Sequence, residues 1–140
     1  MIPPAAFGDG ERVILAELAD VLIPAGAGMP SASEAGVAGD WLDAVLAARP
    51  DLVDPLRAIL AAAAGAPAEE AVERLREHGG FGVLAEIVPN AYYMNPAIRD
   101  RIGYPLQQAV PIDPAADEDP EARALIASVR ARGTICRPTP

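Results

Sequence analysis

The chain has 140 residues and one cysteine, Cys136, a composition that suits one domain and excludes both an intrachain disulfide and a multi-cysteine zinc or iron–sulfur site. Its formal net charge is −9, and it contains no lysine. This charge disfavours nucleic acid and anionic membrane surfaces as partners, because both are bound largely through Lys and Arg side chains.

The N-terminal third predicts two helices. Asp9 is a favourable N-cap for a helix over residues 9–23, whose apolar residues recur on one face. Ser31 and Glu34 have the spacing of a capping box and predict a second helix over residues 31–48. Two carboxylates of that helix are expected on its solvent side: Asp40 and Asp43.

Three further helices are predicted in the middle of the chain. Asp54 and the proline after it begin a third helix, which ends before Gly65. A fourth, over residues 67–78, has a thin apolar stripe and is expected to lie on the outside of the fold. A fifth begins at Phe81, and Pro89 within its apolar pattern predicts a bend.

All three tyrosines fall between residues 91 and 105, in a chain with only six aromatic residues. Asn95 followed by proline predicts the start of a short helix over residues 96–102, with Ile98 and Ile102 facing inward. Gly103 suits the left-handed position that ends such a helix. Tyrosine combines a large apolar ring with a polar hydroxyl and is common at protein interfaces, so a specific surface is expected in this stretch.

The pattern as a whole predicts an all-α fold. We expect a helical domain over residues 1–105, an irregular bundle of about five to six short helices. Residues 106–140 are expected to form an extended, Pro-rich arm with one amphipathic piece over residues 121–130. Its apolar residues are too many for a plain disordered tail, so the arm is expected to wrap its own domain or a partner.

Catalytic groups are scarce in the sequence. His78 is the only histidine, and its place in the last turn of a charged helix is typical of a capping group. Because the chain has no lysine, it can neither form a lysine Schiff base nor bind phosphate through the lysine of a phosphate-binding loop. Glu86, between two apolar residues, is the carboxylate nearest to an apolar stripe, and Cys136 has no base beside it.

Several short elements occur in order along the chain and resemble the gluconate 2-dehydrogenase subunit 3 family. They are Leu18-Ala-Asp-Val-Leu-Ile-Pro24, Pro30-Ser-Ala-Ser-Glu-Ala-Gly-Val37, and the stretch from Ala91-Tyr-Tyr to Ile102-Gly-Tyr-Pro105. Members of that family are small helical subunits without catalytic activity. Their large partner is an FAD-dependent oxidoreductase of the glucose–methanol–choline type, which oxidises an alcohol or sugar hydroxyl. The family is expected to have glycine at the position of Leu106.

The resemblance implies that this chain binds and stabilises a large flavoprotein subunit in a hetero-oligomer. No cofactor is expected in this chain, and FAD is expected in the partner. Residues expected at the partner interface are Tyr92, Tyr93, Asn95, Arg99, Tyr104, Pro105, Leu106 and Ile112.

The location of the complex is also an expectation. The chain shows no export signal and no apolar run of the ~20 residues that a membrane span needs. A cytoplasmic complex is therefore expected, or a periplasmic one if the chain is exported with its partner or trimmed.

Two other functions stay open at this stage. The chain could be a stand-alone helical module that self-assembles or binds a small molecule in a pocket formed by Trp41 and the tyrosines. It could also be a small enzyme that uses Glu86 or Tyr93 as an acid or base.

Overall fold

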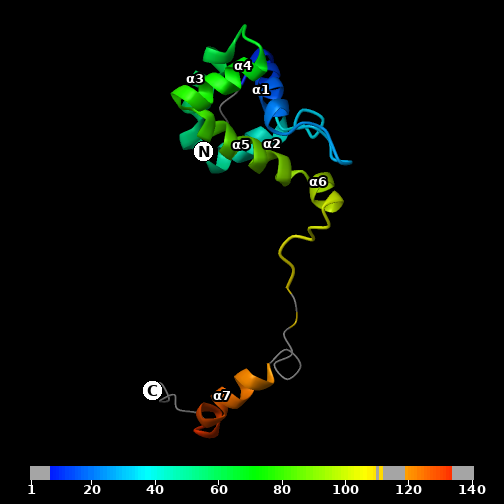
Figure 1. Cartoon of the computed structure of the whole chain (residues 1–140), viewed down its shortest axis with the longest axis vertical. Coiled ribbons are helices and arrows are strands. Elements are labelled where there is room, and N and C mark those ends of the chain that lie inside the picture. Colours follow the sequence, from blue (N-terminus) through cyan, green and yellow to red (C-terminus); the bar gives the residue numbers. More distant parts are fainter. Residues whose placement is uncertain (1–6, 110, 112–118, 134–140) are drawn as a thin grey trace. The chain divides into compact units, whose positions relative to one another are not determined.

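A computed structural model describes residues 7–109, 111 and 119–133 of the chain, and in these residues it contains α-helices and no strand (Figure 1). This confirms the all-α prediction. The helices are α1 Asp9–Leu22, α2 Asp40–Ala48, α3 Val53–Ala63, α4 Ala68–His78, α5 Phe81–Met94, α6 Pro96–Arg101 and α7 Pro120–Ala131, with a short 3-10 helix, η1, at Pro50–Leu52.

The chain divides into two units, the first ending at Leu106 and the second beginning at Gln107. In the second unit the amphipathic piece forms α7, which begins at Asp119, whose side chain accepts a hydrogen bond from the Glu121 amide at 3.0 Å. No residue of α7 is buried, and its large apolar side chains are all exposed: Leu125, Ile126 and Val129.

The first unit is organised around α5. This helix contacts α1, α2, α3, α4 and α6, and it runs without interruption through Pro89. Its buried residues recur at helical spacing and supply the middle of the core: Leu84, Ile87, Val88, Ala91 and Tyr92. As expected, α4 is peripheral, since it buries only Ala71 and Val72.

The beginning of α1 differs from the prediction. Its N-cap is Gly8, and Asp9 is the first helical residue. The Glu11 carboxylate reaches back and accepts a hydrogen bond from the Gly8 amide at 2.8 Å. The carboxylate of Glu11, the third residue of the helix, thus satisfies the backbone N–H of the cap residue Gly8, as in a capping box.

The prediction of a helix over residues 31–39 is wrong. The capping-box hydrogen bonds do form, from the Ser31 amide to Glu34 Oε2 at 2.8 Å and from the Glu34 amide to Ser31 Oγ at 3.3 Å. They open a series of turns, because Gly36 has a φ of +75°, which no right-handed helix tolerates. The second helix therefore begins only at Asp40.

The third helix, in contrast, begins earlier than predicted. The chain enters it through η1, and α3 starts at Val53, one residue before Asp54. The buried Leu52 in η1 fixes this turn to the core.

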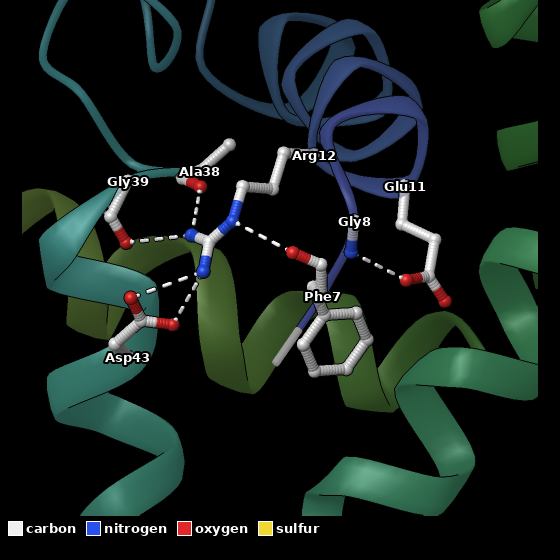
Figure 2. Close-up of polar contacts among 7 residues, drawn as sticks. All are labelled: Phe7, Gly8, Glu11, Arg12, Ala38, Gly39 and Asp43. Atoms are coloured by element: carbon white, nitrogen blue, oxygen red, sulfur yellow. Dashed lines mark hydrogen bonds and ion pairs between the residues drawn. The ribbon is translucent and has the colours of Figure 1, made fainter. Parts of the chain in front are cut away.

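Arg12 joins the start of α1 to the start of α2 (Figure 2). Its Nε donates to the Phe7 carbonyl at 3.2 Å, and Nη1 donates to the carbonyls of Ala38 and Gly39 at 2.7 and 3.2 Å. Its Nη2 binds both carboxylate oxygens of Asp43, at 2.7 and 3.0 Å. The expectation that Asp43 simply faces solvent is therefore wrong. Its carboxylate forms an ion pair with Arg12 that joins the starts of the two helices.

Candidate protein-binding site

We call the segment from Tyr92 to Leu106 the corner. It contains the end of α5, the short helix α6 and the turn after it. In Figure 1 α6 follows directly from the end of α5. Some residues of the corner hold it in place, and others are exposed on its surface.

Tyr92 fixes the corner from inside the core. Its ring is buried, and its hydroxyl donates a hydrogen bond to the Pro30 carbonyl at 2.8 Å. Burial, and after it the neighbouring Tyr93, raises the pKa of the Tyr92 phenol, which therefore stays protonated and able to donate. The Tyr93 ring stands edge-on to it, with the ring centroids 5.4 Å apart. The core thus sets the position of the exposed Tyr93.

Asn95 has two structural roles. Its side-chain oxygen accepts a hydrogen bond from the Ala97 amide at 2.9 Å, which confirms the predicted cap of α6. Its side-chain nitrogen donates to the Ala35 carbonyl at 2.9 Å, across 60 residues of sequence. The same side chain therefore begins the helix and attaches it to the loop between α1 and α2.

Arg99 and Arg101 bind backbone carbonyls of the chain. Arg99 Nη1 donates to the carbonyls of Met94 and Tyr93 at 2.8 and 3.3 Å, while the Arg99 carbonyl accepts from the Tyr104 amide at 2.9 Å. Arg101 Nη1 donates to the Gly28 carbonyl at 2.7 Å. Carbonyls carry no net charge, so these contacts hold both guanidinium groups at the corner without cancelling their positive charge.

The large apolar side chains that the corner exposes are each about half accessible: Tyr93 50%, Ile102 51%, Tyr104 51% and Leu106 51%. We call these four residues the corner surface. In the described part of the first unit, Val13 is the only other large apolar residue that is exposed. The prediction that Ile102 faces inward is wrong, because α6 ends at Arg101 and Ile98 alone is buried beneath it.

The predicted interface residues thus fall into two groups. Tyr92, Asn95 and Arg99 position the corner, whereas Tyr93, Tyr104 and Leu106 are presented to solvent together with the exposed Pro105. Ile112 lies outside the described residues. The sequence-based set omitted Ile102 and Arg101, and the pairing of Arg101 with Gly28 could not be read from a local pattern.

Two of the groups considered for catalysis, Glu86 and His78, have structural partners. Glu86 pairs with Arg49, which also binds Asp51 at 2.7 Å, and the Asp51 contact raises the pKa of the Arg49 guanidinium. His78 Nδ1 lies 3.1 Å from the Arg74 carbonyl, as a capping group would. Cys136 is outside the described residues.

The described ranges contain no group of three His, Cys, Asp or Glu side chains that could hold a metal ion. None of their helices is both long enough and apolar enough to cross a bilayer.

Comparisons with family models, with curated proteins and with solved structures return no match for this chain.

Proposed function

We propose that this chain is a non-catalytic small subunit that binds and stabilises a large FAD-dependent oxidoreductase subunit of the glucose–methanol–choline type. The observation that carries the proposal is the concentration of exposed apolar side chains at the corner surface. Tyrosine and arginine are enriched among the residues that contribute most to binding, and the buried core of an interface is more apolar than its rim.

The rigidity of the corner supports this proposal. Three side chains tie the corner to the loop between α1 and α2, namely Tyr92 to Pro30, Asn95 to Ala35 and Arg101 to Gly28. A surface that is already ordered loses little conformational entropy when it binds, so more of its contact energy appears as affinity.

The resemblance to the subunit 3 family supplies the identity of the proposed partner. One feature of the backbone supports it: Leu106 has a φ of +64°, a region that favours glycine, the residue expected at this position in the family. In this proposal FAD belongs to the large subunit, which oxidises an alcohol or sugar hydroxyl, and the complex is a cytoplasmic hetero-oligomer.

Co-expression with the flavoprotein encoded by a neighbouring reading frame tests the proposal. Size-exclusion chromatography of the purified pair is expected to show one complex that contains both chains, with the flavin absorbance in the same peak. Tyr93→Ser combined with Tyr104→Ser is expected to weaken the complex by at least about thirtyfold, since interface tyrosines often contribute 1–2 kcal/mol or more each.

Val13→Ser is the matched control, because Val13 is as exposed as the two tyrosines but lies on α1. It is expected to leave the complex intact. Equal weakening by the control and by the tyrosine variant would refute the assignment of the interface to the corner. Elution of the two wild-type chains as separate species would refute the proposed function.

A further inference from the structure

A groove lies between α3 and α4, and none of the residues that line it belongs to the corner. This groove has a volume of about 350 Å³. Residues of α3, α4 and the glycine after α4 line it: Ile59, Ala62, Ala63, Ala71, Arg74, Leu75, His78 and Gly79.

The groove exists because small side chains meet there. Alanines occupy three of the lining positions, two on α3 and one on α4, so the helices leave room for a further apolar group. Ile59, Ala63 and Ala71 are buried and form its floor. A volume of this size, with a mostly apolar lining and a few polar groups, is in the range of small-molecule sites, which is roughly 300–1,000 Å³.

Arg74 gives the groove a positive charge. Within the described residues its guanidinium forms no ion pair or hydrogen bond, whereas Arg76, two residues later, pairs with Glu73 at 3.4 Å and stacks on the Phe81 ring at 4.7 Å. His78 lies one turn after Arg74, and the hydrogen bond of its Nδ1 with the Arg74 carbonyl leaves Nε2 for another partner. Arg99 and Arg101 also lack a carboxylate partner among the described residues, but their guanidinium groups bind backbone carbonyls, whereas that of Arg74 does neither.

We infer that this groove binds a small apolar carboxylate, such as the anion of a medium-chain fatty acid. The hydrocarbon part would cover the floor formed by Ile59, Ala63 and Ala71 and would remove that apolar surface from water. The carboxylate would lie at the Arg74 guanidinium, whose planar fork matches two carboxylate oxygens. The hydrocarbon part of such a ligand thus meets a floor formed by α3 and α4, and its carboxylate meets the Arg74 guanidinium on α4.

Calorimetric titration of the full chain with octanoate tests this inference. Octanol has the same hydrocarbon chain without the charge, and acetate has the charge without the chain. Octanoate is expected to bind with one site per chain and more tightly than either control. Equal binding of octanol would refute the role assigned to the cation, and binding only at the level of acetate would refute the role assigned to the apolar floor.

Two substitutions locate the site. Arg74→Gln is expected to weaken octanoate binding about two- to fivefold, the effect of removing an exposed ion pair. Arg76→Gln makes the same charge change on the same helix outside the groove lining and is expected to have no such effect. Equal loss in both variants would mean that octanoate responds only to the overall charge of the protein, and the inference would fail.

Filling the groove gives a test that does not depend on charge. Ala62 lines the groove and is exposed, so Ala62→Leu adds volume there without disturbing the core. This variant is expected to melt at the wild-type temperature and to lose octanoate binding. Unchanged binding by a folded Ala62→Leu protein would place octanoate elsewhere and overturn the inference.

Discussion

Replacement of Arg12 by methionine tests how the first two helices are held together. Methionine keeps an unbranched apolar side chain at this position but removes the guanidinium. All the hydrogen bonds that join Arg12 to Phe7, Ala38, Gly39 and Asp43 are then lost at once (Figure 2). The carbonyls and the carboxylate remain, with only water to replace their partner.

The expected cost follows from exposure. The Arg12 side chain is 24% accessible and that of Asp43 is 36%, so water compensates for part of the loss. Hydrogen bonds of a charged group contribute about 1.5–3 kcal/mol each when buried, and breaking a buried pair costs about 3–5 kcal/mol. With partial exposure we expect a loss of about 2–4 kcal/mol in the free energy of unfolding, or roughly 10–20 °C in Tm for a unit of this size.

Arg57→Met is the matched control. Arg57 is 46% accessible, and its nearest carboxylate contact is to Glu11 at 3.7 Å, so its ion pair is expected to contribute only about 0–1 kcal/mol. Urea unfolding followed by circular dichroism measures both variants. A loss for Arg12→Met no larger than that for Arg57→Met would refute the role assigned to Arg12.

Three further predictions concern stability. Tyr92→Phe is expected to cost about 1 kcal/mol by leaving the Pro30 carbonyl without its donor, whereas Tyr93→Phe is expected to cost nothing measurable in the same denaturation assay. Burial disfavours the charged form of Asp20, but hydrogen bonds from Ser33 and Ser31 outweigh it and hold the pKa of Asp20 below its ordinary value of 3.8. The pKa of Asp20 is lower in the folded than in the unfolded chain, so its ionised carboxylate stabilises the fold above pH 3.8, and this stabilisation is lost as the pH falls through the folded pKa. The difference in unfolding free energy between wild type and Asp20→Asn should therefore shrink in acid. A chain that ends after Leu106 is expected to keep the Tm of the full chain, since every buried residue in the described ranges belongs to the first unit; a large drop in Tm on calorimetry would contradict the division into two units.

The sequence predicted those parts of the fold that depend on neighbouring residues. The helical periodicity around Leu15 and Leu84, the cap at Asn95 and the left-handed turn at Gly103 all rest on contacts within a few positions. These local preferences agree with the tertiary structure, so the helices appear close to where they were expected.

The errors arose where distant contacts or a single backbone angle decided the outcome. Ser31 and Glu34 make their local capping bonds, yet the left-handed Gly36 prevents a helix from following. Arg12 binds Asp43 across 31 residues of sequence, a pairing that exists only once the tertiary fold brings the start of α1 to the start of α2. Patterns within a window of a few residues contain no information about such pairs.

The candidate site was predicted in place but not in detail. The clustering of the tyrosines indicated the corner, and the pair Asn95 and Pro96 predicted the start of the short helix within it. The burial of Tyr92 rather than Tyr93 follows from helical spacing, since Tyr92 lies four residues after the buried Val88, and its hydroxyl then donates to the Pro30 carbonyl. Ile102 was assigned to the core by its spacing from Ile98, but α6 is one residue too short to bury it.

Hydrogen–deuterium exchange of the chain, alone and with the flavoprotein, tests the central claim most directly. The account predicts that complex formation slows exchange in residues 92–106, with α4 unchanged, because the corner surface becomes covered by the large subunit. Formation of a complex in which the corner exchanges at the same rate as in the isolated chain would contradict the account.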